Sequence, residues 1–496
     1  MTLHSLCRAF IGRMPADGDP AICFEGRWRP WRDYRGLVDD LNAWLDAGGI
    51  AAGARVGFAP RNRPSSLIAL IALLSREVTV VMIHSYQSQS GMAQDMARHR
   101  LTGFVCDRSD FGAPIEAAAR GAGLAAFALH KLDEERIALC GGNAVAEGDS
   151  GQAPGIWLLT SGTTGAPKHH PFGYDQVGRM VSDNIGGAAP SPDPIPALLY
   201  FPLSNISGLR AGLAALLGGR PVVLLPRFTI ADWHAHVMRY RLASASIPTA
   251  GISMALSANI APRDLSSLNF VMTGAAPLAV ETQRAFERRF GVPVLLAYGA
   301  TEFGGPVTQV TLADRERYGE AKLGSVGRPY AGNAVRIRHP QSDHQVPPAE
   351  IGLVEVRSAR MGPDWIPTTD LGAIDGDGFL YLHGRADGAI NRGGFKIVPE
   401  TIEAVLMRHA DIDEVAVVGV PDARLGEVPA AAVVMRGGVL SPDIGALVRH
   451  VRQTLYATQV PARWRIVTAL PRNASLKIDR VAVRMLFEAD AKGEDG

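Results

Sequence analysis

The sequence predicts an α/β protein with a large N-terminal domain of layered α/β subdomains and a small α+β C-terminal domain. A chain of 496 residues is too long for one ordinary hydrophobic core, so at least two domains are expected. Helix-like and strand-like patterns alternate along the first half, and the pattern changes after about residue 386. The apolar fraction of 47% and the charged fraction of 20% are typical of a globular chain.

The alternation in the first half favours layers built around parallel sheet. Residues 33–47 carry apolar positions at helical spacing and stop before Gly48 and Gly49, which predicts a helix. A short apolar run at 55–59 predicts a strand, and a helix-like run follows from Ser65. Further buried strands are predicted at residues 104–106, 156–159 and 221–225. Strands that alternate with helices build parallel sheets covered by helices.

The C-terminal segment has a pattern of its own. A helix is predicted from Pro399 to about His409, because proline suits the first position of a helix. The other predicted elements are strands at 414–420, 430–435 and 464–467 and a helix at 444–455. These elements suffice for a compact domain. We therefore expect domains at residues 1–386 and 387–496.

Charge and apolar pattern exclude several classes of protein. Lys and Arg total 50 against 49 Asp and Glu, which gives no reason to expect nucleic acid or a membrane surface as the main partner. The most apolar stretches, 67–83 and 208–225, are interrupted by charges and are too short to span a bilayer. The N-terminus lacks the apolar core of a signal peptide, so a cytoplasmic location is expected. Homodimer formation remains open.

The cysteines and the paired histidines do not indicate a metal site. The four cysteines are Cys7, Cys23, Cys106 and Cys140. They are widely spaced and form no Cys-x-x-Cys pair, so we expect reduced thiols and neither a zinc site nor a disulfide framework. His169 and His170 are adjacent, and neighbours on a strand face opposite sides. One packed and one surface histidine is therefore favoured over joint ligation of a metal.

Residues 161–168 form a loop rich in Gly and Thr directly after the predicted strand at 156–159. Its glycines let backbone N–H groups approach a ligand closely, its hydroxyl groups add donors, and Lys168 adds positive charge. These groups suit a polyphosphate, although an isolated loop of this kind is also compatible with a mobile polar turn. The spacing is not that of a P-loop NTPase, because His169 follows Lys168. The candidate nucleotide-binding residues here are Thr160, Ser161, Gly162, Thr163, Thr164, Gly165 and Lys168.

The string Ser-Gly-Thr-Thr-Gly-Ala-Pro-Lys at 161–168 resembles the phosphate loop of the adenylate-forming (AMP-binding) superfamily. That superfamily contains acyl-CoA synthetases, adenylation domains of peptide synthetases and luciferases. Further motifs follow in the family's order up to residue 480, so the resemblance covers nearly the whole chain. It implies the adenylate-forming enzyme fold with a small mobile C-terminal domain, and within it the acyl-CoA synthetase branch of aryl- or acyl-CoA ligases.

Two segments resemble the family's residues around the phosphates and the adenine. Tyr-Gly-Ala-Thr-Glu at 298–302 is similar to the family's Tyr-Gly-x-Thr-Glu. Glu302 is a hard oxygen ligand suited to Mg²⁺, and Thr301 can hydrogen-bond the α-phosphate. Tyr298, beside Gly299, offers a flat face for adenine. The loop that resembles the one meeting the adenine and acyl groups contains Gly274, Ala275 and Ala276.

Further motifs imply a ribose site and a hinge. Thr-Thr-Asp-Leu-Gly at 368–372 resembles the family's Thr-Gly-Asp-Leu-Gly, with Thr369 in place of glycine. The resemblance implies that Asp370 accepts hydrogen bonds from both ribose hydroxyls. Gly-Arg-Ala-Asp at 384–387 resembles a further segment of the family, which implies that Arg385 also reaches the ribose and that Asp387 is the hinge between the domains.

The resemblance also assigns roles near the C-terminus. Gly393 and Gly394 match a loop that faces the thiol-bearing second substrate. Residues 471–480 resemble the family's Pro-Arg-x-x-x-Gly-Lys-Ile-x-Arg, so Lys477 corresponds to the catalytic lysine of adenylation. Leu476 stands where the family has glycine, which changes how the lysine is delivered.

The expected acyl and thiol site departs from the family's pattern. Residues 200–209 resemble Pro-Leu-Phe-His-x-x-Gly-Leu, but Ser204 replaces the aromatic residue and Asn205 the histidine. The residues expected to border the acyl group and the thiol are Asn205, Ile206, Gly208, Thr273, Ala297, Gly393 and Gly394. Their small or apolar side chains favour an apolar or aromatic acid over an amino acid.

The resemblance implies an ATP-dependent ligase. A carboxylic acid joins the α-phosphate of ATP, pyrophosphate leaves, and the acyl group then passes to the thiol of coenzyme A, with Mg²⁺ as the metal. Two alternatives remain open. The acceptor can be the phosphopantetheine of a carrier protein. The chain can also be a catalytically impaired relative that binds nucleotide or acyl ligand, because Leu476 and Ser204–Asn205 depart from the pattern.

Overall fold

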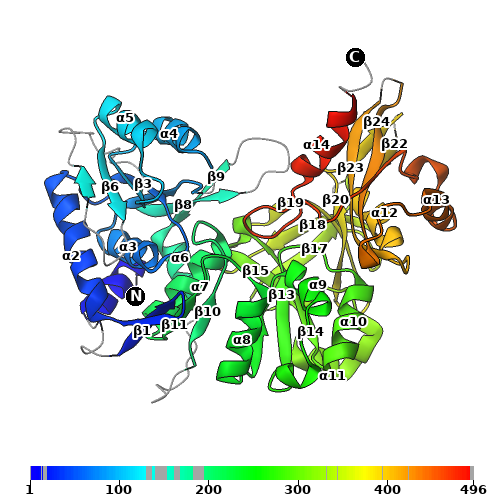
Figure 1. The fold of residues 1–496 in the computed structure, drawn as a ribbon, viewed down its shortest axis with the longest axis horizontal. Coiled ribbons are helices and arrows are strands. Elements are labelled where there is room, and N and C mark those ends of the chain that lie inside the picture. The colour runs from blue at the N-terminus through cyan, green and yellow to red at the C-terminus, as the bar shows by residue number, and fades with distance from the viewer. Residues whose placement is uncertain are drawn as a thin grey trace. The chain divides into compact units, whose positions relative to one another are not determined.

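The chain folds into two compact α/β units, residues 1–240 and 241–496. The computed structural model describes residues 2–12, 14, 19–85, 87–129, 137–139, 153–160, 168–182, 195–330, 332–342, 344–393, 395–422 and 424–491. Figure 1 shows the helices and strands of both units, coloured along the chain.

A seven-stranded sheet organises the first unit, in the order β7-β6-β5-β3-β4-β8-β9. Its strands are β3 (Arg55–Ala59), β4 (Thr79–Met82), β5 (Gly103–Asp107), β6 (Ala125–Leu129), β7 (Ile137–Leu139), β8 (Gly155–Thr160) and β9 (Lys168–Gly173). The inner strands pair in parallel, and β7 and β9 pair antiparallel at the two edges. Strands β4, β5 and β6 are buried along their whole length, as expected for a parallel sheet with covered faces. The predicted α/β class is confirmed.

Helix α3 (Pro64–Ser75) forms the crossover between β3 and β4, and Pro64 occupies its first turn. Every residue of α3 after Pro64 is buried, because the helix is apolar around its whole circumference. Helices α1 (Leu3–Gly12) and α2 (Arg32–Ala47) pack against it, and α2 agrees with the predicted helix at 33–47. The remaining helices near this sheet are α4 (Gln89–Arg98), α5 (Ala113–Gly121) and α6 (Tyr174–Ser182).

A smaller sheet completes the first unit, in the order β10-β11-β1-β2. Its strands are β1 (Pro20–Phe24), β2 (Arg27–Pro30), β10 (Ala197–Leu199) and β11 (Val222–Leu224). Helix α7 (Ile206–Leu217) packs against β10, and α8 (Ile230–Tyr240) ends the unit. The three described cysteines, Cys7, Cys23 and Cys106, are buried and free in this unit.

The second unit begins with a five-stranded sheet in chain order. Its strands are β12 (Ser244–Ser246), β13 (Phe270–Gly274), β14 (Val294–Ala300), β15 (Gly305–Gln309) and β16 (Arg328–Pro329). The first three are parallel, so their carboxyl ends lie at one edge. Helices α9 (Thr249–Ser257) and α10 (Val280–Phe290) pack against each other beside this sheet. An antiparallel sheet follows, built from β17 (Ala334–Arg338), β18 (Gly352–Arg357), β19 (Ile366–Ile374) and β20 (Leu380–Arg385).

The C-terminal sheet of the second unit is covered on both faces. Its strands are β21 (Ile390–Arg392), β22 (Phe395–Ile397), β23 (Ile412–Asp422), β24 (Gly426–Met435) and β25 (Arg463–Ile466). Val415 and Val417 of β23 pack in a cluster with α12 (Pro399–Leu406) and α13 (Ile444–Arg452). Ala416 and Val418 pack on the other side, in a cluster with α14 (Arg480–Ala491). This arrangement explains the continuous apolar run of β23.

The predicted C-terminal helices are present but shorter than expected, because α12 ends at Leu406 and α13 at Arg452. The division into domains at 386/387 stays a prediction, since the contacts group residues 241–496 into one unit. In the part of the chain that the structure describes, no helix is long and apolar enough to cross a membrane.

Candidate active site

In the sequence, the expected phosphate loop connects β8 to β9, which pair antiparallel. Thr160 and Lys168 pair across this hairpin and close it. Residues 161–167 lie outside the described residues, as do the side chains of Thr160 and Lys168. Strand β8 runs parallel to β4, so the loop starts at the carboxyl edge of the sheet. That edge is where open α/β sheets bind ligands.

The adjacent histidines of β9 point to different surroundings. The His169 ring lies 4.3 Å from that of His99, and its Nε2 lies 2.8 Å from the Met82 carbonyl oxygen. The His170 ring instead packs against Phe172, at 4.7 Å. Among the residues that the structure describes, no group of three His, Cys, Asp or Glu side chains is arranged to hold a metal ion.

A second loop follows β13 at the carboxyl edge of the sheet in the second unit. Gly274 pairs with Ala297 of β14, and a Cβ at Gly274 would lie 2.6 Å from the Ala297 carbonyl oxygen. Only glycine permits this approach of the two strands. Ala275 has a left-handed backbone with φ of 67°. Strained backbone of this kind clusters at ligand sites.

Thr249, at the start of α9, ties this loop to the strand end. Its hydroxyl lies 3.2 Å from the carbonyl oxygens of Gly274 and Ala276, and 3.4 Å from the Thr273 hydroxyl. Sequence reasoning did not single out Thr249, because its partners are backbone atoms on a distant segment.

Tyr298, Asp370 and Arg385 form one hydrogen-bonded group. The Tyr298 phenol donates a 2.5 Å hydrogen bond to the Asp370 carboxylate. Asp370 and Arg385 face each other across β19 and β20, with 3.5 Å between guanidinium and carboxylate. Burial raises the pKa of the Tyr298 phenol, and the charge of Asp370 raises it further. Tyr298 therefore remains a protonated donor at neutral pH.

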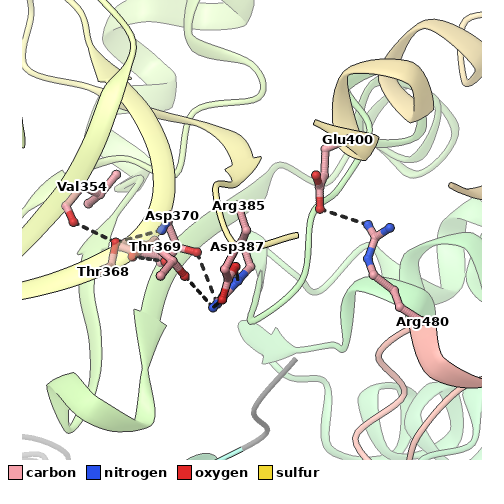
Figure 2. A network of polar contacts seen from close by, with 9 residues as sticks. Val354, Thr368, Thr369, Asp370, Arg385, Asp387, Glu400 and Arg480 are labelled. Carbon is pink, nitrogen blue, oxygen red and sulfur yellow. Dashed lines mark hydrogen bonds and ion pairs between the residues drawn. The ribbon is translucent and has the colours of Figure 1, made fainter. Parts of the chain in front are cut away.

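Two threonines support this group (Figure 2). The Thr368 hydroxyl donates to the Val354 carbonyl oxygen at 2.7 Å and accepts from the Asp370 backbone N–H at 3.0 Å. The Thr369 hydroxyl lies 2.6 Å from Arg385 Nη2. The departure from the family's glycine at position 369 thus adds a contact to the arginine expected at the ribose.

Arg385 also pairs with the proposed hinge residue. Its guanidinium donates two hydrogen bonds to Asp387, at 2.9 and 2.8 Å (Figure 2). These bonds, followed by the charge of Asp370, raise the pKa of Arg385 despite its partial burial. The guanidinium is thereby fixed between the two carboxylates.

Lys477 follows a tight turn that the Asn473 side chain closes. Asn473 Oδ1 accepts hydrogen bonds from the backbone N–H groups of Ser475, at 2.9 Å, and Lys477, at 3.1 Å. Leu476 adopts a left-handed backbone with φ of 61°. This explains why glycine suits the position, since a side chain in this region costs about 1–2 kcal/mol.

The Lys477 amine lies among the charged residues of the candidate site. Burial lowers its pKa, and the positive charge of Arg385 acts in the same direction. The negative charges of Glu302 and Asp370 oppose that shift. The structure therefore brings together Lys477, Glu302, Asp370 and Arg385, which are distant in the sequence.

Glu302 lies in a short helical turn, η2 (Thr301–Phe303), directly after β14. The Ser358 hydroxyl donates to the Phe303 carbonyl oxygen at 2.7 Å, and the Tyr330 phenol donates to the Pro306 carbonyl oxygen at 2.9 Å. The buried Arg360 side chain also donates a hydrogen bond to the Pro306 carbonyl oxygen.

The single carboxylate of Glu302 fits Mg²⁺, which proteins usually hold through one or two carboxylates together with substrate phosphates.

The expected acyl-site residues divide between the two units. Asn205, Ile206 and Gly208 lie at the start of α7 in the first unit. A Cβ at Gly208 would lie 2.2 Å from the Pro202 carbonyl oxygen, so the close approach requires glycine. The members in the second unit are Thr273, Ala297 and Gly393. Gly394 lies outside the described residues.

Asn62 fixes the segment that carries Asn205. Its Nδ2 lies 3.2, 3.0 and 3.3 Å from the carbonyl oxygens of Tyr200, Phe201 and Leu225. Its Oδ1 accepts the backbone N–H of Leu203 at 3.1 Å. Sequence reasoning did not single out Asn62, because its partners are backbone atoms on distant segments.

The two parts of the chain match known families. Residues 12–363 match the family described as AMP-binding enzyme, and residues 401–477 match the AMP-binding enzyme C-terminal domain. The chain is 32% identical over 354 residues to an oxalate–CoA ligase of Arabidopsis thaliana, covering 67% of each chain. It is 28% identical over 481 residues to a 2-succinylbenzoate–CoA ligase of Bacillus pumilus, covering 93% of each.

The fold agrees with a solved structure, ATP-bound MatB from Rhodopseudomonas palustris. The TM-score is 0.79 at 22% identity, and the match covers 98% of this chain and 99% of that one. Because the family match extends over most of the chain and the charged groups of the candidate site converge, the chain belongs to the AMP-binding enzyme family.

Proposed function

We propose that the protein is an AMP-forming acid–thiol ligase that makes an acyl-CoA. A carboxylate oxygen attacks the α-phosphorus of ATP, the bond to the bridging oxygen breaks, and pyrophosphate leaves. The thiolate of coenzyme A then attacks the acyl carbon of the adenylate and AMP departs. The observation that carries the proposal is the convergence of Lys477 with Glu302, Asp370 and Arg385 in a family of adenylate-forming enzymes.

The first step brings two anions together, so the enzyme must neutralise charge and hold the reactants in line. The Lys477 ammonium supplies a positive charge within the candidate site, where burial strengthens its interaction with an anion. The loop at 161–168 is assigned to the phosphates. Mg²⁺ held by Glu302 would supply Lewis-acid stabilisation of phosphate charge.

Asp370 and Arg385 are assigned to the ribose. Asp370 accepts from Tyr298 through one carboxylate oxygen, and its other oxygen faces Arg385. This pre-organised carboxylate fixes the sugar and thereby orients the α-phosphate. Thr301 is assigned to the α-phosphate, and Gly274, Ala275, Ala276 and Gly299 to the adenine and acyl groups.

The second step is assigned to a rotation of the C-terminal domain about Asp387. The rotation withdraws Lys477 and brings the Gly393–Gly394 loop to the acyl group. A hinge lets one site serve two chemical steps. Domains at 1–386 and 387–496 accommodate this motion.

The acid is proposed to be apolar or aromatic, on the basis of Ile206, Gly208, Ala297 and their neighbours. The names of the two relatives above specify oxalate and 2-succinylbenzoate, which differ widely in size, so relatives do not determine the acid. Coenzyme A is the proposed acceptor, and a carrier-protein phosphopantetheine is the alternative. We place the reaction in the cytoplasm. Whether two copies of the chain form a homodimer is left open.

The test is an ATP–pyrophosphate exchange assay over a panel of aliphatic, aromatic and dicarboxylic acids. Exchange that depends on one class of acid supports the proposal and excludes an impaired binding protein. The absence of exchange with every acid would contradict adenylation. Mass spectrometry of products formed with coenzyme A or with a holo-carrier protein then decides the acceptor.

Lys477→Ala should lower exchange by about 100-fold, because an electrostatic donor in a partly dry site is lost. The matched control is Ala474→Ser, which alters an exposed position of the same turn and should leave exchange unchanged. Full exchange by Lys477→Ala would refute the role of this lysine.

A further inference from the structure

Glu400 is a partly buried carboxylate that the adenylation chemistry above does not use. It lies in the first turn of α12, and Figure 2 shows its side chain pointing toward Arg480. One oxygen, Oε1, accepts from Arg480 Nη2 at 3.1 Å. The other, Oε2, is buried without a hydrogen-bond partner among the described residues.

The second oxygen of Glu400 packs against the backbone of Gly384. A Cβ at Gly384 would lie 2.5 Å from Glu400 Oε2, and the backbone there has φ of 97°. Any side chain at this position would therefore displace the carboxylate. Gly384 directly precedes Arg385, so Glu400 braces the strand end that presents the arginine assigned to the ribose.

The first oxygen connects Glu400 to the segment that carries Lys477. Arg480 ends that segment and also bonds both oxygens of Glu403, at 2.9 and 3.0 Å, and the Val417 carbonyl oxygen, at 2.6 Å. An isolated bridge pairs Arg472 with Ile478 and closes the lysine turn at its base. Arg480 thus anchors the base of the turn to α12.

We infer that Glu400 is a positioning residue that couples the Lys477 turn to the ribose-binding strand end during adenylation. This inference rests on the proposed function. Glu400 touches no reacting group in this arrangement. It contacts Arg480 on one side and Gly384 on the other, and so sets the spacing between Lys477 and Arg385.

The two contacts of Glu400 differ in their relation to the proposed hinge. Glu400 and Arg480 both follow Asp387, so a rotation there carries them together. Gly384 precedes Asp387, so the same rotation separates it from Glu400. The brace against Gly384 therefore belongs to the adenylating arrangement alone, and its loss should affect the first half-reaction.

The experiment compares the two half-reactions in the full-length protein. Adenylation is measured by ATP–pyrophosphate exchange, and thioester formation by supplying synthetic acyl-adenylate with coenzyme A. Glu400→Ala should lower the kcat of exchange by about ten-fold, because small misplacements of reacting groups are costly. Thioester formation from the supplied adenylate should stay within about two-fold of wild type, since that step does not use the brace.

Two variants separate positioning from general stability. Glu400→Gln keeps the volume against Gly384 and an acceptor for Arg480, so it should retain at least about half of the exchange rate. Glu403→Ala removes the other carboxylate on Arg480 but no contact with Gly384, and should lower the thermal unfolding midpoint and both half-reactions alike.

Equal losses in both half-reactions of Glu400→Ala, or no loss in either, would overturn the inference. Retained thioester formation shows that the variant is folded. Failure of the proposed function has a different signature, because wild-type protein would then support no exchange with any acid.

Discussion

The phenol of Tyr298 and the carboxylate of Asp370 are joined by a 2.5 Å hydrogen bond that links two separate sheets of the second unit. Tyr298 lies on β14 of the five-stranded sheet, and Asp370 lies on β19 of the antiparallel sheet. The bond therefore holds the residue assigned to the ribose at a fixed place relative to the turn that carries Glu302.

Tyr298→Phe should weaken ATP binding without changing acid binding. The ring remains, but Asp370 loses a donor, and hydrogen bonds to charged groups contribute about 1.5–3 kcal/mol. We expect the KM for ATP in the exchange assay to rise by about ten-fold, with the KM for the acid unchanged. Tyr456→Phe, at a tyrosine that is 83% exposed, is the control. A KM for ATP within about two-fold of wild type would contradict the assignment.

Asn62→Asp should destabilise the first unit. The change preserves shape but turns the amide donor toward three carbonyl oxygens into an acceptor, at a side chain that is 2% exposed. A loss on the order of 3 kcal/mol in the free energy of unfolding is expected, measured by urea denaturation. Asn269→Asp, at an exposed position, should change it by less than about 0.5 kcal/mol.

Asn62→Asp should also raise the KM for the acid, because the segment leading to Asn205 loses its anchor. The KM for ATP should be less affected. If the stability of Asn62→Asp equals that of wild type, the carboxamide is not the anchor that its contacts indicate.

The strands of the first unit were predictable because their burial requires apolar residues in a regular pattern along the sequence. Strand β5, predicted at 104–106, spans Gly103–Asp107, and the predicted helix at 33–47 is α2. These elements bury apolar faces, and burial requires apolar residues whichever element packs against them. The local sequence pattern is therefore sufficient to predict them. The ends of α12 and α13 were less predictable, since termination depends on tertiary contacts: α12 packs on β23, and α13 packs on α12.

The candidate site was predictable only through motifs that resemble a known family. Nothing local in the sequence places Lys477 beside Glu302 and Asp370. Thr249, Asn62 and Glu400 were missed because their partners are backbone atoms or single side chains on distant segments. Such contacts produce no periodic pattern in the amino-acid sequence.

Leu476→Gly should leave the lysine turn intact and relieve its strain. The backbone at 476 has φ of 61°, and the hydrogen bond from its N–H to the Asn473 carbonyl oxygen does not need a side chain. We expect the free energy of unfolding to rise by up to about 1 kcal/mol, with exchange activity at least that of wild type. Leu476→Val should instead lower the free energy of unfolding, because β-branched residues fit the left-handed region of backbone conformation poorly. A higher thermal unfolding midpoint for Leu476→Val than for Leu476→Gly would contradict this account.

His236 should make the first unit sensitive to acid. The side chain is 5% exposed, and burial lowers its pKa to about 4 from an ordinary value of 6.5. Between these two values the unfolded chain binds a proton that the folded chain does not. The stability contribution of neutral His236 is therefore present above pH 6.5 and is lost as the pH falls toward 4. The loss amounts to about 3 kcal/mol at most.

His236→Phe should flatten this dependence. An aromatic ring is kept and the titrating group is removed, although the hydrogen bond with the Pro196 backbone is lost. Urea denaturation at several pH values between 4 and 7 measures the slope of the free energy of unfolding against pH. The control is His344→Gln, at an exposed position, which should keep the wild-type slope. An unchanged slope in His236→Phe would show that other groups cause the acid sensitivity, because a buried neutral histidine must otherwise contribute to it.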